Sequence, residues 1–159
     1  MHFLKLIFSI TLISTCFVGE AQSLRYQIYE ESKGWHPWVK ENTIVGERGK
    51  RIEAIKILPF DFPPGASLQY RVHIKTDGWQ PWTNAGETAG TEDEDRRIEA
   101  IEIKLTNFPG QSVCYWIWTG YRESTTRDVP RKYEACDGQL AGTTQRRKPL
   151  EQLRIWLTP

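Results

Sequence analysis

The chain has 159 residues and a formal net charge of +1, from 21 Lys plus Arg against 20 Asp plus Glu. This balance gives no electrostatic basis for binding nucleic acid or an anionic membrane surface, so we expect neither as a partner.

The first 21 residues have the features of an export signal. A lysine lies near the N-terminus, residues 3–18 are mostly apolar, and Gly19 and Ala21 place small residues where a signal peptidase reads the chain. Because the apolar stretch is short for a membrane span, we expect cleavage after Ala21 and a secreted or cell-envelope protein, periplasmic or extracellular. The alternative is lipoprotein anchoring through Cys16, although the preceding threonine is bulkier than usual before a lipidated cysteine.

Removing those 21 residues leaves 138, from position 22 to 159, which suits a single domain with a real core. Two cysteines remain, Cys114 and Cys136, and an exported protein meets conditions that permit oxidation. No histidine or further cysteine accompanies them at metal-ligand spacing, so the pair predicts a disulfide rather than a metal site. Closing this loop stabilises the fold by about 3 kcal/mol in the chain-entropy model.

Three sequence blocks recur in the same order in two successive units, residues 22–62 and 63–108. The blocks are "GWHPW", "VGE" and "RIEAI" at residues 34–38, 45–47 and 51–55, and "GWQPW", "AGT" and "RIEAI" at residues 78–82, 89–91 and 97–101. The tryptophans recur at an offset of 44 and the last block at 46, so one loop has gained two residues. This is a strong repeat signal.

A third, degenerate unit occupies residues 109–159. "AGT" returns at residues 141–143 and "LEQLRI" at 150–155 overlays "IEAIEI" of the second unit. The tryptophan pair is missing, and Tyr133 to Cys136 stand near its place. Cys114 and Cys136 then fall on the first and second strands of this unit, where we expect the disulfide to replace packing that the tryptophans supply elsewhere.

Each unit reads as four short strands separated by Gly, Pro, Asn and Asp turns. Residues 26–28 and 70–74 alternate apolar with polar side chains, as half-buried strands do. The "RIEAI" blocks are too short and too β-branched for helices, and their Glu-Ala step suggests a bulge. We therefore predict an all-β fold of three pseudo-symmetric, four-stranded units: a β-prism, by analogy with jacalin-type prism lectins, or alternatively a β-trefoil.

The blocks "GWQPW", "AGT" and "RRIEAIEIKL", in this order and spacing, resemble the clostridial hydrophobic repeats with a conserved tryptophan, known as ChW repeats. The resemblance covers nearly the whole mature chain, strongly in the first two units and weakly in the third. It implies a secreted or surface-exposed protein that binds polysaccharide or other cell-surface components. Because the third unit lacks the tryptophan pair, any such site belongs to the first two units.

The tryptophans are the main candidate for ligand binding. Side chains three apart on a regular strand point to opposite faces, so we expect one tryptophan of each pair in the core and its partner at the surface. The proline inside each block places the segment at a sheet edge or a bulge. Exposed aromatic rings can stack on sugars while neighbouring polar groups bind hydroxyls. The candidate residues are Trp35, Trp38, Trp79, Trp82, Gln80 and Asn84.

An enzyme is the less favoured interpretation, and we expect no catalytic residues, no cofactor and no metal. His36 aligns with Gln80, and His73 with Tyr29, so neither histidine belongs to the repeated framework. One conspicuous set of carboxylates recurs in all three units, at Glu53, Glu99 and Glu151. Catalytic groups converge in an asymmetric site, so we expect these glutamates to pair with Arg51, Arg97 or a backbone turn.

The charged run at residues 92–97 could suggest calcium, because oxygen ligands cluster there. It lacks the glycines of a known calcium loop, and a solvated hairpin tip fits it better. The sequence thus predicts a non-catalytic binding module for glycan or cell-surface polysaccharide. The alternative is an extracellular or envelope protein whose repeats bind a surface protein or serve a structural purpose.

Overall fold

A computed structural model describes residues 21–120 and 131–159. The expected export signal, apart from Ala21, and Cys16 lie outside the described residues. Within the described part the chain forms only strands and turns, and no helix there is long and apolar enough to cross a membrane. The prediction of an all-β repeat fold is confirmed, whereas the choice between prism and trefoil stays a prediction.

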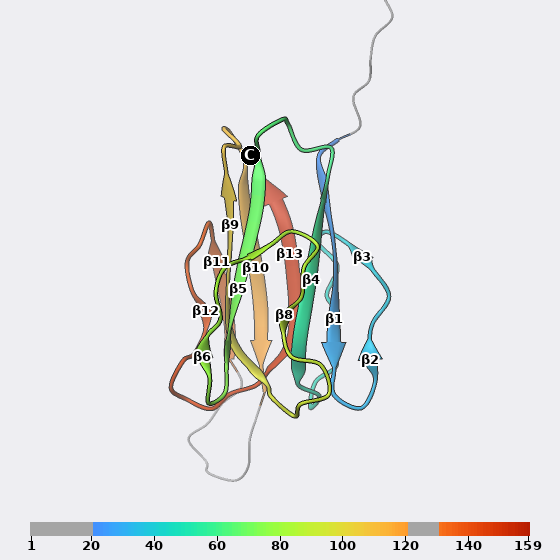
Figure 1. Cartoon of the computed structure of the whole chain (residues 1–159), viewed down its shortest axis with the longest axis vertical. Helices are drawn as coiled ribbons and strands as arrows, with labels where there is room; N and C mark the ends of the chain where they lie inside the picture. Colours follow the sequence, from blue (N-terminus) through green and yellow to red (C-terminus); the bar gives the residue numbers. More distant parts are fainter. Residues whose placement is uncertain (1–20, 121–130) are drawn as a thin grey trace, which may run out of the picture.

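Three long antiparallel hairpins, one from each unit, run along the long axis of the molecule (Figure 1). They are β1 (Ser23–Glu30) with β4 (Ile52–Phe60), β5 (Ser67–Ile74) with β9 (Ile98–Thr106), and β10 (Ser112–Thr119) with β13 (Leu150–Thr158). Each hairpin is the centre of its own sheet. The units are therefore not built from four equal short strands, as the sequence had suggested.

The remaining strands are short, with one exception in the third unit. They are β2 (Gly34–Trp35), β3 (Val39–Lys40), β6 (Gly78–Trp79), β7 (Thr83–Asn84), β8 (Ala89–Gly90), β11 (Arg131–Cys136) and β12 (Ala141–Gly142). β2 and β3 pair with β1, and β6 and β7 pair with β5. β11 pairs with β10 and so takes the same edge in the third sheet.

The three units exchange short edge segments in a closed ring. β8 of the second unit pairs with β4 of the first, and β12 of the third pairs with β9 of the second. Val45 of the first unit completes the ring by an antiparallel bridge to Leu153 on β13. Each unit thus supplies backbone partners to the sheet of another unit.

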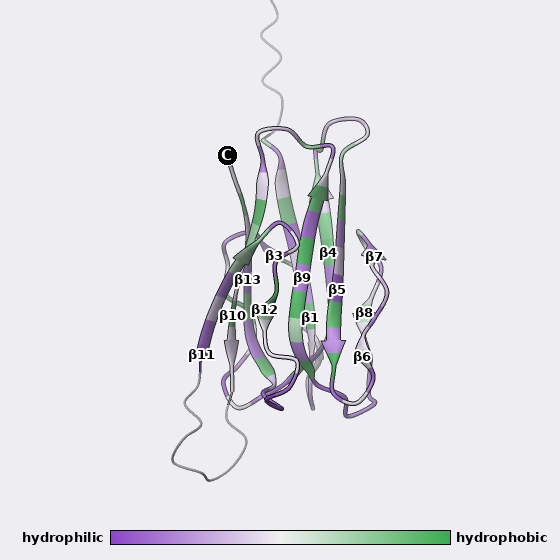
Figure 2. Ribbon diagram, turned by 90° about the vertical axis from the view of Figure 1, so that its left-hand side faces the viewer, coloured by the Kyte–Doolittle hydropathy of each residue, from purple (hydrophilic) through white to green (hydrophobic). Residues whose placement is uncertain are grey.

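Side chains that alternate along the long strands form one core shared by all three units. On β5, Leu68, Tyr70, Val72 and Ile74 are buried, whereas the residues between them face outward. Figure 2 shows the same alternation as green and purple bands along β5 and β9. Isoleucine is the main filler of the core, and three tyrosines join it.

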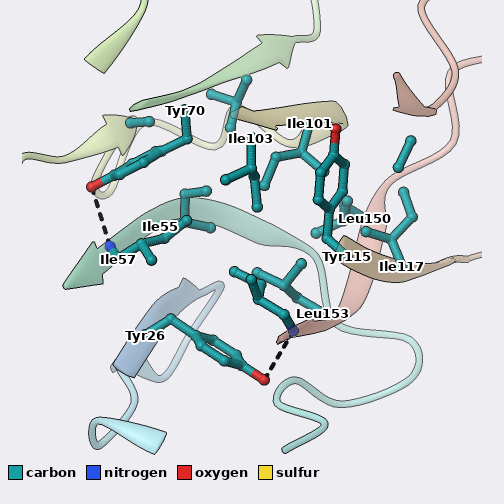
Figure 3. Close-up of a cluster of buried hydrophobic side chains, with 14 of the residues drawn as sticks. Tyr26, Ile55, Ile57, Tyr70, Ile101, Ile103, Tyr115, Ile117, Leu150 and Leu153 are labelled. Carbon is teal, nitrogen blue, oxygen red and sulfur yellow. Dashed lines mark hydrogen bonds between the residues drawn. The ribbon is translucent and has the colours of Figure 1, made fainter. Parts of the chain in front are cut away.

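Tyr26, Tyr70 and Tyr115 occupy equivalent positions and connect neighbouring units (Figure 3). The Tyr70 hydroxyl accepts a hydrogen bond from the Ile57 N–H of the first unit at 3.2 Å and donates to the Glu87 carbonyl. The Tyr26 hydroxyl likewise accepts from Ile155 N–H of the third unit. Burial raises the pKa of all three phenols to about 12.

The predicted bulge at the Glu-Ala step occurs in the first two units, and the third unit has a bulge at the equivalent Glu-Gln step. Tyr29 lies opposite Ala54 and Glu30 opposite Ile52, so Glu53 is the extra residue, and Glu99 and Glu151 hold the same place. The exchanged glycine packs on this bulge. Gly90 has a φ of +111°, and a Cβ there would come within 2.2 Å of the Glu53 carbonyl oxygen. Only glycine fits this position, and Gly46 and Gly142 are its equivalents.

The predicted disulfide is confirmed, because Cys114 and Cys136 are bonded and lie directly opposite each other on β10 and β11. In the other two units the tryptophan segments pair at the corresponding edge of the hairpin. The disulfide therefore fixes the edge strand in the one unit that lacks the "GWxPW" block.

Candidate functional site: the tryptophan-bearing outer faces

Both tryptophans of each block lie outside the core, so the prediction that one of each pair is buried is wrong. Trp38 is 39% exposed, and Trp35, Trp79 and Trp82 are half-buried. Side chains three apart point to opposite faces only where one regular strand runs through the whole block. Instead β2 ends at Trp35 and β3 begins only at Val39, with Pro37 in the irregular stretch between them. Isoleucines and tyrosines of the long hairpins already fill the centre.

In the second unit the two tryptophans enclose an arginine on the outer face of the β5–β9 hairpin. The Arg71 guanidinium lies 4.7 Å from the ring centroids of both Trp79 and Trp82, within cation–π range. Lys104 Nζ lies 4.0 Å from the Trp82 centroid, and Arg71 Nε donates to Glu102 Oε2 at 2.7 Å. The segment therefore packs on charged outward-facing residues of its own sheet.

The first unit has a simpler version of this arrangement. Lys56 Nζ lies 4.3 Å from the Trp35 centroid, and the Trp35 ring meets Tyr29 edge-on at 5.5 Å. Trp79 meets His73 in the same way, also at 5.5 Å, which confirms the alignment of Tyr29 with His73. Trp38 is the most exposed of the four rings, and therefore the most accessible to a ligand.

The two polar candidates differ in their availability. Gln80 Oε1 accepts the Gly90 N–H at 2.7 Å and its Nε2 donates to the Gly90 carbonyl, so this amide holds the exchange strand β8. Asn84 is exposed, and its Oδ1 accepts from Gln69 Nε2 at 3.0 Å. Of the two, Asn84 is the better placed to reach a ligand.

The ChW family model, described as Clostridial hydrophobic W, matches residues 31–58 and 73–107. Each match includes one tryptophan block and most or all of the long strand that follows it. The chain thus carries two ChW repeats, one in each of its first two units. No curated protein and no solved structure is significantly similar to it.

The third unit lies outside the two matched ChW repeats, yet its outer face also carries tryptophans. Trp116 and Trp118 on β10 and Trp156 on β13 alternate with core residues of the same strands. Arg154 lies over Trp156 at 4.6 Å, and Arg48 of the first unit lies over Trp118 at 4.1 Å. These three tryptophans alternate with apolar residues along their strands, and this alternation is the sequence signal that could have located them.

The three repeated glutamates are held by structural partners, as the sequence suggested. Arg51 Nε contacts Glu53 Oε1 at 2.7 Å, and Arg97 Nη2 contacts Glu99 Oε1 at 2.9 Å. Glu151 has no such arginine in the repeat; instead it accepts the Gly49 N–H at 2.9 Å, and burial raises its pKa. Each carboxylate thus stabilises a bulge or the loop that packs on it.

The charged run of the second unit also contacts the first unit. Its residues 92–96 are exposed, in keeping with a hairpin tip. However, Asp93 accepts a hydrogen bond from the Tyr29 hydroxyl, and Asp95 pairs with Arg51. These two carboxylates bridge adjacent ChW repeats.

Proposed function

We propose that this protein is an exported, non-catalytic binding module that recognises glycan or cell-surface polysaccharide through the tryptophans of its two ChW repeats. The observation that supports this proposal is the position of Trp35, Trp38, Trp79 and Trp82. All four are outside the core and partly accessible. The fold does not need these large rings to fill its centre.

The surroundings of the rings suit a sugar better than a purely apolar ligand. Indole faces stack on the apolar faces of pyranose rings, and polar groups nearby can bind hydroxyls. Lys56 in the first repeat and Arg71 and Asn84 in the second supply such groups. With one shallow site in each repeat, rigid connection of the two would raise the apparent affinity for a polymer by avidity.

Titration of the intrinsic tryptophan fluorescence tests this proposal. Soluble cell-wall, plant and host polysaccharides are added to the oxidised protein, and we expect at least one to change the emission. Trp38→Ala and Trp82→Ala should each weaken that binding about tenfold or more while the melting temperature changes little. Trp116→Ala, in the unit without a ChW match, is the control and should bind as the native chain does.

No response to any polysaccharide, together with capture of a purified envelope protein, would overturn the carbohydrate proposal. That result would favour the alternative, a ChW module that binds a surface protein.

A further inference from the structure

An open cavity of about 520 Å³ lies between the second and third units. The second unit contributes His73, Lys75 and Thr76, and the loop between β12 and β13 contributes Thr144, Gln145 and Arg147. Figure 1 shows this loop beside β6. The volume lies within the range of about 300–1,000 Å³ that is typical of small-molecule sites.

The first and second units form an equivalent but smaller cavity of about 190 Å³. Its own ion pairs occupy it: Arg51 contacts Glu31 at 2.9 Å and also pairs with Asp95. The Tyr29 hydroxyl donates to Asp93 across the same junction. This junction is therefore closed by contacts within the protein.

At the second junction two of the corresponding charges are reversed. Lys75 stands where the first junction has Glu31, and Arg147 stands where it has Asp95. Among residues 21–120 and 131–159, neither Lys75 nor Arg147 has an ion-pair partner. Glu99, at the base of the cavity, is paired with Arg97 and lies 3.6 Å from His73 Nδ1, so its charge is already balanced within the protein.

Arg147 is also in a backbone conformation that arginine seldom adopts. Its φ is +53°, and the equivalent positions hold Gly49 and Asp95, residue types that tolerate the left-handed region better. Local backbone strain of this kind is concentrated at functional sites. Glycine would be easier to accommodate at this position, but the chain has Arg147 there, and Arg147 lines the cavity.

We propose that the cavity between the second and third units binds an acidic sugar residue, whose carboxylate or phosphate is recognised by Lys75 and Arg147. Thr76, Thr144 and Gln145 supply hydrogen-bonding groups for the sugar hydroxyls. Charge-assisted hydrogen bonds from lysine and arginine are the usual means of recognising such anions. The inference rests on the proposed function for the saccharide nature of the ligand, but the cavity does not use the tryptophan rings.

The test titrates the oxidised full chain with D-glucuronate, glucose 6-phosphate and neutral D-glucose, followed by amide NMR shifts and calorimetry. We expect one or both acidic sugars to bind at least about tenfold more tightly than glucose, with shifts at Gly78 and Thr144. The tighter of the two acidic probes identifies the anionic group. Inorganic phosphate is a further probe, and binding as tight as that of glucose 6-phosphate would overturn the saccharide assignment.

Two variants examine the cations separately. Lys75→Glu reproduces the charge of the first junction, and Arg147→Asn removes the charge while keeping a residue that tolerates the left-handed backbone. Each should weaken binding of the acidic probe about tenfold or more without lowering the melting temperature. Lys132→Glu, an equal charge change on the exposed part of β11, should leave binding unchanged.

Equal affinity for glucose and the acidic sugars, or unchanged binding in both cavity variants, would overturn the inference. Its failure can be told apart from that of the proposed function. Shifts at Gly78 without any polysaccharide-induced change in tryptophan emission would refute the tryptophan site alone. Tryptophan quenching that Trp38→Ala abolishes, with no acidic-sugar shifts at Gly78, would refute the cavity alone.

Discussion

At the scale of single residues, the tryptophans of the ChW repeats hold charged side chains rather than fill the core. Arg71 lies between two indole rings and pairs with Glu102, and Lys56 covers Trp35. An outward-facing lysine or arginine is normally free to change rotamer. Here it is fixed against an aromatic surface, and its charge is presented beside the ring that we propose as the ligand platform.

Replacing Arg71 tests this interaction. Arg71→Ala removes two cation–π contacts and one partly exposed ion pair, so we expect a loss of about 1–2 kcal/mol in the free energy of unfolding. The emission of Trp79 and Trp82 should also shift to the red, because both rings become more hydrated. Chemical denaturation followed by fluorescence measures both effects. Arg71→Lys should retain part of the stability, and an unchanged Arg71→Ala protein would contradict the account.

At the scale of elements, the exchanged segments explain why the "AGT" block recurs. Ala89 is buried in the core, Gly90 packs on the bulge of the neighbouring unit, and the Thr91 N–H donates to the Glu53 carbonyl at 2.9 Å. In the third unit, the Thr143 N–H donates to the Glu99 carbonyl in the same way, at 3.0 Å. The block is thus the contact between successive units.

Gly90→Ala should destabilise the protein by at least about 3 kcal/mol, because it combines an unfavourable φ with a clash against backbone. Gly65→Ala is a matched control, since Gly65 has a φ of +83° and open space around it. Gly65→Ala should lower the free energy of unfolding by only about 1 kcal/mol. Denaturant titration of both variants separates the conformational cost from the cost of close approach, and equal losses would argue against the packing contact.

The edge strand β11 should depend on the disulfide. The bridge spans a sequence separation of 22, so breaking it with Cys114→Ala and Cys136→Ala should reduce stability by about 3 kcal/mol. Amide hydrogen exchange should accelerate most in β11, because among the strands of residues 21–120 and 131–159 it pairs with β10 alone. The native protein under reducing conditions should behave in the same way. Uniform acceleration over all three sheets would show that the bridge stabilises the whole fold instead.

At the scale of the whole molecule, one core joins the three units, and each junction contains a buried tyrosine. Ionisation of these phenols makes the free energy of unfolding depend on pH in the alkaline range. Their pKa is near 10 in the unfolded chain and about 12 in the fold. Since the unfolded state ionises first, their contribution is complete below pH 10 and is lost as the pH rises from 10 towards 12.

Each buried tyrosine can account for a loss on the order of 2 kcal/mol in the free energy of unfolding as the pH rises from 10 towards 12. Denaturation measured by circular dichroism at a series of alkaline pH values should therefore show a steep fall in stability. Tyr70→Phe should be less stable at neutral pH, because the Ile57 N–H loses its acceptor, but should show a shallower alkaline decline. Parallel pH profiles for the two proteins would rule out this linkage for Tyr70.

The features that could be predicted from the sequence are those that depend on residues of a single unit. The repeats, the bulge at Glu53 and the partnership of Cys114 with Cys136 follow from local patterns and spacing. Contacts between units were not predictable in this way. Nothing near Val45 indicates Leu153 as its partner, and the orientation of the tryptophans depends on where β2 ends rather than on residue parity.

The ring of exchanged segments limits how many repeats can form a closed molecule. In a fragment that contains only the first two units, the edge of β9 would lack its partner β12. The segment at Val45 would likewise lack its partner β13. The unpaired Val45 segment of one fragment could then pair with the unpaired β9 edge of the next, head to tail. Such a chain of fragments has no built-in end. Such a fragment should polymerise at high concentration. The degenerate third unit therefore covers both of these edges within one chain, because its β12 pairs with β9 and its β13 bridges to Val45.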